Sequence, residues 1–157
     1  MMNQEYLHYL FSYDEQVGHL VRNFRRGKAP KGTYSTCKDK DGYIVVSVDR
    51  KNYREHRLIW LYHYGQFPQN DIDHINWVRD DNRIENLRDV TKSQNKQNSP
   101  VQKNNKCGVK GVWLHKQTKK WCASIYVNGK NKYIGSYKSL EEAEVAYKAA
   151  KKILHDF

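Results

Sequence analysis

The fold is decided by residues 71–98, which read DIDHINWVRDDNRIENLRDVTKSQNKQN. Two short apolar segments, residues 72–75 and 86–90, flank a polar loop and are predicted to form strands. Thr91 or Ser93 is predicted to cap a helix that follows directly. The order is therefore strand, loop, strand and helix, with carboxylate, imidazole and carboxamide side chains concentrated in and beside the loop.

The chain is strongly basic, with a formal net charge of +11 over 157 residues. Residues 1–100 hold 16 Lys and Arg against 13 Asp and Glu, whereas residues 101–157 hold 12 against 4. The last third therefore carries the charge that would attract a polyanion, either nucleic acid or an acidic membrane. Tryptophans and tyrosines among its lysines favour nucleic acid, because no segment there has the apolar face of an interfacial helix. A merely soluble basic protein is the alternative.

Several classes of protein are not expected from this sequence. No apolar segment approaches 18 residues and the N-terminus lacks a signal-peptide pattern, so we expect a soluble intracellular protein. Cys37, Cys107 and Cys122 form no Cys-x-x-Cys pair, which argues against a disulfide framework or a cysteine zinc site. A hydrophobic fraction of 38% predicts a modest core, in one domain or two small ones.

Local patterns predict the elements of the first hundred residues. The expected elements are a helix over 4–11, a basic loop over 23–36, a hairpin of 42–48 with 53–56 around a turn at 49–52, and a helix over 57–64 that Gly65 ends. The basic loop could contact phosphate or be a solvated loop. Trp60 is expected in the core. Residues 97–105 have no apolar periodicity and read as a linker.

The rest of the chain predicts a three-stranded sheet covered by one helix. Strands are expected over 109–115, 121–127 and 132–137, with Asn128-Gly129 as a hairpin turn. Ser139 and Glu142 form a capping box that opens a helix to about residue 154. Trp121 and Tyr137 are expected to pack in the core of this sheet. The predicted domains are residues 1–98 and 107–157, joined by a linker over 99–106.

The middle segment also carries the chemistry. Asp73 and His74 are neighbours on a predicted strand, so one side chain can hold a metal while the other meets water. Asn95, on the first turn of the next helix, can supply a second oxygen ligand, and oxygen-only ligation suits Mg²⁺ rather than Zn²⁺. Each residue has a plainer reading as a structural histidine, a turn carboxylate or a loop asparagine. Separately these signals are weak.

Together they resemble a family. Four runs, His56-Arg57-Leu58-Ile59, residues 72–76, residues 81–91 and residues 93–98, are similar to the HNH endonucleases of the phage and intron-encoded homing type. The resemblance implies that His74 is the general base and that Asn86 is the central asparagine that ties the loop and orients the histidine. It also implies that Asp73 and Asn95 ligate one divalent ion, Mg²⁺ or Mn²⁺, where other HNH proteins have a final histidine in place of Asn95. The implied reaction is hydrolysis of a phosphodiester to a 5′-phosphate and a 3′-hydroxyl.

Residues 107–157 resemble a second family, the plant ethylene-response-factor (APETALA-type) DNA-binding domain. The likeness lies in GVKGVWLH at 108–115, WCASI at 121–125, YIGSY at 133–137 and EAEVAYKAA at 142–150. It implies that the sheet enters the major groove. With strand alternation, it places seven residues against DNA: Lys110, Trp113, His115, Ser124, Tyr126, Asn131 and Tyr133. Several arginines of the plant domain are replaced here, which implies a looser sequence preference.

We therefore expect an α+β protein with a ββα-metal nuclease module, an N-terminal β-hairpin extension, and a sheet-plus-helix DNA-binding module. The expected activity is metal-dependent cleavage of double-stranded DNA by a monomer or a DNA-induced dimer, with no membrane or small-molecule partner. The resemblance implies a phage-encoded protein in the bacterial cytoplasm. The rival is a non-catalytic DNA-binding protein that keeps an HNH scaffold. An RNA-binding module would leave Asp73, His74 and Asn95 without a purpose.

Overall fold

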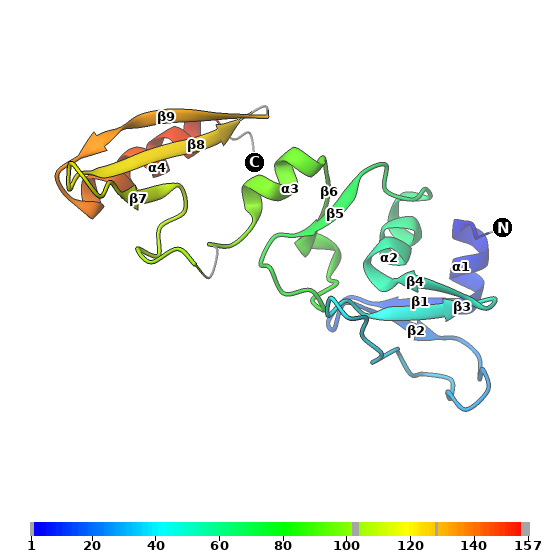
Figure 1. Ribbon diagram of the computed structural model, residues 1–157. Helices are drawn as coiled ribbons and strands as arrows, with labels where there is room; N and C mark the ends of the chain where they lie inside the picture. The colour runs from blue at the N-terminus through cyan, green and yellow to red at the C-terminus, as the bar shows by residue number, and fades with distance from the viewer. Residues whose placement is uncertain (1, 102–103, 128, 155–157) are drawn as a thin grey trace. The chain divides into compact units, whose positions relative to one another are not determined.

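The computed structural model describes residues 2–101, 104–127 and 129–154 and is a mixed α/β protein of helices and small antiparallel sheets (Figure 1). The chain divides into two compact units, residues 1–92 and 93–157, each with its own cluster of buried apolar side chains. The expected linker over 99–106 falls within the second unit, and residues 102–103 lie outside the described part. No helix of the described residues is long and apolar enough to cross a membrane.

The first unit contains three two-stranded sheets and two α-helices. Its elements are α1 (Gln4–Leu10), β1 (Phe11–Asp14), β2 (His19–Arg22), β3 (Val45–Val48), β4 (Lys51–Arg54), α2 (Glu55–Tyr64), β5 (Asp71–His74), the short 3₁₀ helix η1 (Ile84–Asn86) and β6 (Leu87–Val90). The sheets are the antiparallel pairs β1–β2, β3–β4 and β5–β6. The predicted strands on either side of the polar loop are therefore confirmed as β5 and β6.

The hairpin β3–β4 turns on two residues instead of the four predicted. Asp49 and Arg50 have φ angles of 49° and 63°, and Val48 pairs with Lys51. Two consecutive residues with positive φ match the right-handed twist of paired strands. The hairpin β1–β2 was not predicted, because only the single Gly18, with φ 73°, marks its turn. Gly18 is required there, since an added Cβ would lie 2.5 Å from the backbone nitrogen of Arg83.

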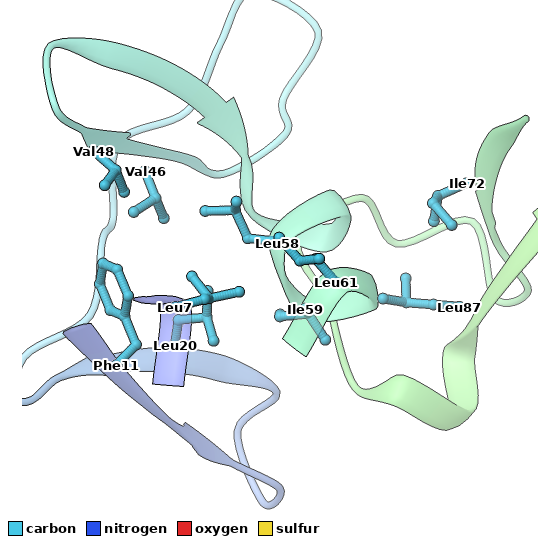
Figure 2. Packing of buried hydrophobic residues seen from close by; sticks show 10 residues of the cluster. All are labelled: Leu7, Phe11, Leu20, Val46, Val48, Leu58, Ile59, Leu61, Ile72 and Leu87. Atoms are coloured by element: carbon cyan, nitrogen blue, oxygen red, sulfur yellow. The ribbon is translucent and has the colours of Figure 1, made fainter. Parts of the chain in front are cut away.

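Helix α2 is the centre of the first unit. It ends at Gly65 as predicted, where φ is 75° and the N–H donates to the Leu61 carbonyl at 3.0 Å. It begins at Glu55, two residues before the predicted start. Figure 2 shows Leu58, Ile59 and Leu61 of α2 lying between the N-terminal elements with β3 on one side and the β5–β6 pair on the other. Trp60 is only partly buried but packs against this cluster.

The second unit contains α3 (Lys92–Asn98), β7 (Val112–Leu114), β8 (Trp121–Val127), β9 (Lys130–Tyr137) and α4 (Leu140–Leu154). The strands form one antiparallel sheet in the order β7–β8–β9, and α4 covers one of its faces (Figure 1). The predicted sheet and helix are confirmed, although β7 is shorter than expected and Asn128 of the predicted turn lies outside the described residues. Trp121 and Tyr137 pack against the core as predicted.

The capping box at the start of α4 has one bond shifted by a residue. The Glu142 N–H donates to Ser139 Oγ at 3.2 Å, and Glu142 Oε2 accepts from the Lys138 N–H at 3.0 Å. The first bond pairs an N–H group that the helix start leaves without an intrahelical acceptor, and the second ties the residue before the N-cap to the first turn. The box thus fixes where α4 leaves β9.

Candidate functional site

Asp73 and His74 are the last two residues of β5, and both are buried. The register with β6 sets Asp73 opposite Arg88 and His74 opposite Leu87. Arg88 donates from Nε and Nη2 to Oδ2 of Asp73, at 2.9 and 2.8 Å. His74 bonds the loop instead. The two neighbours therefore reach different partners, in keeping with strand alternation.

The imidazole of His74 is enclosed by a carboxamide and two rings. Its Nε2 lies 3.0 Å from Oδ1 of Asn82, and its centroid lies 5.2 Å from that of His56 and 5.8 Å from that of Tyr43. Burial lowers the pKa of His74, which the hydrogen bond with Asn82 opposes only in part. His74 is therefore neutral at pH 7, the state that a general base requires.

His56 adds a second buried imidazole beside the first. It is 4% exposed, meets His74 edge to face, and its Nδ1 has no hydrogen-bond partner among the described residues. Burial lowers the pKa of His56 to about 3, helped by the neighbouring His74. A positive charge on either ring is disfavoured by burial and by the neighbouring ring, so both imidazoles stay unprotonated.

Asn86 ties the loop between β5 and β6. Its Nδ2 donates to Asn76 Oδ1 at 3.0 Å and to the Asp81 carbonyl at 2.7 Å, while its Oδ1 accepts from the Asn76 N–H at 3.0 Å. The backbone carbonyl of Asn86 also accepts from the Ile75 N–H, next to His74. Truncation of the Asn86 side chain would remove its bonds to Asn76 and to the Asp81 carbonyl and leave the backbone bond to Ile75. Asn86, at the end of the loop, therefore bonds the start of the loop at Ile75 and Asn76 and its middle at Asp81.

The expected metal ligands do not all lie in one unit. Asp73 belongs to the first, whereas Asn95 lies on α3 and belongs to the second, so the distance between them is not determined. Within the described ranges, no group of three or more His, Cys, Asp or Glu residues is placed to hold a metal ion. A pair of one carboxylate and one amide is smaller than such a group and suits a hydrated Mg²⁺, which needs few protein ligands. Ligation by Asp73 and Asn95 stays a prediction.

Comparison with known proteins identifies this region. Residues 53–97 match the family model of the HNH endonuclease. The match runs from β4 through α2, β5 and β6 into α3, so the HNH endonuclease domain includes Asp73, His74, Asn86 and Asn95. Neither the curated proteins nor the solved structures gave a match.

A buried network that the sequence did not predict joins residues of the HNH endonuclease match to strand β2. Glu55, the first residue of α2, is 0% exposed, and its carboxylate accepts from Nδ2 of Asn82 at 2.8 Å and from the Leu20 N–H at 3.0 Å. His19 Nδ1 lies 2.8 Å from the same carboxylate, and this hydrogen bond raises the pKa of His19. Asn82 lies in the motif run 81–91, and Glu55 directly precedes His56, the first histidine of the motif. These positions were the only local signals for the two residues. Their pairing depends on tertiary contacts alone.

Five of the seven residues that are expected to contact DNA lie on one face of the sheet β7–β8–β9 in the second unit. Ala123, Ile125 and Val127 of β8 point into the core beneath α4, so the alternate residues of β8 point away from it. The register pairs Ser124 with Tyr133 and Tyr126 with Asn131, and it pairs Trp113 with Cys122 on the same side. The outer face comprises Trp113, Ser124, Tyr126, Asn131 and Tyr133. Trp113 is 41% and Tyr133 62% exposed, whereas Ser124 is buried.

Lys110 and His115 have partners elsewhere in the second unit. Lys110 Nζ donates to the carbonyls of Lys96, Gln97 and Ser99 at the end of α3, at 2.6 to 3.2 Å. Burial lowers its pKa. His115 Nδ1 accepts from the Thr118 N–H at 3.3 Å. Contact of these two residues with DNA stays a prediction, and in the structure Lys110 caps a helix.

Proposed function

We propose that this chain is a divalent-metal-dependent DNA endonuclease of the homing type that hydrolyses phosphodiesters in double-stranded DNA. The observation that carries the proposal is the match of residues 53–97 to the HNH endonuclease family. Within these residues His74 is buried and neutral beside the buried Asp73. A neutral imidazole at a strand end, next to a carboxylate and a loop that Asn86 holds in place, is suited to take a proton from water.

Each side chain has a role in this mechanism. His74 removes the proton from the attacking water, and Asn86 keeps the loop behind His74 in position. Asp73 and Asn95 would hold one Mg²⁺ or Mn²⁺ ion, and Arg88 orients the Asp73 carboxylate through its two bonds. When bound, the ion would supply positive charge at the leaving 3′ oxygen. The products are a 5′-phosphate and a 3′-hydroxyl.

The second unit would hold the nuclease on its substrate. Its outer sheet face presents Trp113, Tyr126 and Tyr133, whereas the exposed Lys130 and Lys132 of the edge strand β9 pair with Val127 and Ile125 and so lie on the side of the sheet that α4 covers. Aromatic and cationic side chains on one sheet suit contact with bases and phosphates in a groove. Because both units belong to one chain, binding by the sheet raises the local concentration of DNA at the HNH endonuclease domain.

Incubation of supercoiled plasmid DNA tests the activity directly. With Mg²⁺ we expect nicked or linear products, and with EDTA we expect none. Cleavage that survives EDTA would contradict metal dependence. Ligation of the nicked product without a kinase step would support 5′-phosphate ends. Mapping the ends on a random DNA library would then give the target sequence.

One observation favours a non-catalytic DNA-binding protein as the second candidate. Arg88 forms two hydrogen bonds with the proposed ligand Asp73, and this ion pair could serve the fold alone. Binding of duplex DNA without cleavage, under every divalent cation tested, would support this candidate. Stronger competition by RNA than by duplex DNA would contradict both candidates.

A further inference from the structure

A buried chain of hydrogen bonds leads from β2 to the ring of His74. His19 Nδ1 and Asn82 Nδ2 each lie 2.8 Å from Oε2 of Glu55, and the Leu20 N–H donates to Oε1. On its other side, Oδ1 of Asn82 lies 3.0 Å from Nε2 of His74. Glu55 and Asn82 are both 0% exposed, so water does not compete for these bonds.

Glu55 decides which way the Asn82 amide faces. The Leu20 N–H donates to its Oε1, and Nδ1 of His19 lies 2.8 Å from its Oε2, so this carboxylate serves as an acceptor. Turning the amide over would bring its oxygen against Oε2, so that two acceptors would face each other at about the present separation. A buried polar group left without its partner costs about 1–3 kcal/mol. The nitrogen of the amide therefore faces Glu55, and its oxygen faces His74.

The direction of the amide decides which nitrogen of His74 carries the proton. A carboxamide oxygen has no hydrogen to give, so Nε2 of His74 must be the donor. A neutral imidazole has one N–H, and the other nitrogen then has a free lone pair. That other nitrogen is Nδ1.

We propose that Glu55 and Asn82 are positioning residues that hold neutral His74 as its Nε2–H tautomer and so make Nδ1 the atom that takes the proton from water. The inference rests on the proposed function for the role of His74, although the tautomer exists whether or not DNA is cut. Neither residue touches the substrate. They act through the ring of His74, as the carboxylate that orients the imidazole does in a hydrolytic triad.

Nitrogen NMR of the full chain labelled with ¹⁵N-histidine measures the tautomer directly. At about pH 8, where an ordinary histidine is neutral, we expect His74 to show one proton-bearing Nε2 and one bare Nδ1. Loss of the signal in His74→Ala assigns it. In Asn82→Leu, which keeps the side-chain volume but not the acceptor, both shifts should move toward averaged values. A proton on Nδ1 in the unaltered protein would overturn the proposal.

A pair of isosteric substitutions separates positioning from packing. Glu55→Gln leaves the direction of the Asn82 amide undetermined, because a Gln amide can face it with either end. We expect single-turnover cleavage to fall about 10- to 100-fold with DNA affinity unchanged. Adding Asn82→Asp to Glu55→Gln offers only acceptors to His74 and should restore most of the rate. Exposed Glu85→Gln and Asn70→Asp are the matched controls and should have no effect.

The two readouts also separate this inference from the proposed function. If the unaltered protein cuts no DNA but shows the Nε2–H tautomer, the nuclease proposal fails and the orientation by Asn82 holds. If the unaltered protein cuts DNA and both Glu55→Gln and the double variant cut it at the same rate as the unaltered protein, the positioning role fails. Equal loss in Glu55→Gln and in the double variant, with thermal melting unchanged, would also contradict it. If Asn82→Leu does not fold, the tautomer of the unaltered protein and the comparison of Glu55→Gln with the double variant still test the proposal.

Discussion

The two units of this protein bury different kinds of side chain. Seven polar or charged side chains are buried in the first unit, whereas Ser124 is the one such side chain in the described part of the second. The first unit buries two carboxylates, two imidazoles and two carboxamides on α2, β5 and the loop that follows β5. The second keeps an apolar core beneath α4 and presents its tyrosines, Trp113 and lysines outward.

Under the proposed function, this difference separates chemistry from binding. Burying a polar group costs free energy unless it is hydrogen-bonded, so a fold that needs only stability avoids it. The first unit offsets that cost with bonds that converge on His74 and on the loop held by Asn86. The second unit has no such cost and leaves its contact groups in water, where a polyanion can reach them. Four predictions test this separation.

The largest effect is expected at His74. His74→Ala should lower single-turnover cleavage about 100-fold to 10,000-fold, because the base acts on the chemical step. DNA affinity, measured by fluorescence anisotropy, should stay the same, because binding belongs to the second unit. His63→Ala, at the exposed end of α2, is the control and should cut normally. Undiminished cleavage by His74→Ala would remove His74 from the role of base.

The second effect belongs to the exposed lysines of the edge strand β9. If about six phosphates are neutralised, DNA affinity should fall ~1,000-fold between 50 and 200 mM salt. Lys130→Ala with Lys132→Ala should make the slope of log affinity against log salt shallower by about two. Lys148→Ala on α4, where the lysine pairs with Glu144, is the control. A salt-independent affinity would contradict the division between the units.

The third effect concerns the backbone of the second unit. Gly111 and Gly108 both have φ of 73°, but an added Cβ at Gly111 would collide with the Ser124 carbonyl oxygen and the Tyr147 ring, whereas Gly108 has nothing within 4 Å. Gly108→Ala should cost about 1–2 kcal/mol from the backbone alone. Gly111→Ala should cost about 2–5 kcal/mol, because overpacking adds to it.

Hydrogen exchange locates this loss. Protection in Gly111→Ala should fall in β7, β8 and α4 and stay unchanged in the first unit, because each unit has its own core. Equal losses from both glycine variants would mean that the site at Gly111 relaxes without cost. Loss of protection in both units together would show that they unfold as one.

The smallest effect is the acid sensitivity of the first unit. The pKa of His56 is about 3 in the folded protein against 6.5 for an ordinary histidine, so the unfolded chain binds its proton first as the pH falls. Stability from this residue is complete above pH 6.5 and decreases as the pH falls toward 3. Between pH 7.5 and 5 the loss should be about 2 kcal/mol. The pKa of His19, which its bond to Glu55 raises, acts in the opposite direction.

A comparison of leucine variants checks this assignment. His56→Leu should flatten the pH dependence of urea unfolding by about the same 2 kcal/mol. His63→Leu, whose histidine has a lowered pKa but is exposed at the end of α2, should flatten it less. Hydrogen exchange should place the change in the first unit. Parallel pH dependences for the unaltered protein and His56→Leu would contradict the assignment.

Local signals predicted much of the fold. The alternation of β8, the helix end at Gly65 and the capping box at Ser139 each lie within a few neighbouring residues, and each was found where predicted. The hairpin β1–β2 was missed because Phe11 was assigned to the preceding helix and a single glycine marks the turn.

The candidate site was predicted only in its central part. Asp73, His74 and Asn86 lie close together in the sequence, and the structure places them at one end of β5 and its loop. Asn95 was assigned to the same module, yet α3 belongs to the second unit, where Lys110 bonds the carbonyls at its end. That contact joins residues 13 apart in the chain, beyond the reach of a local pattern.

The sequence by itself determined the order of most strands and helices, the basic and aromatic character of the last third, and the motif that contains His74. These properties depend on the identity and spacing of near neighbours. Only the tertiary structure decided that Glu55 and His19 stand behind Asn82 and fix the ring of His74. Residues 27 and 36 apart in the chain meet there because the buried donors and the carboxylate need each other once water is excluded.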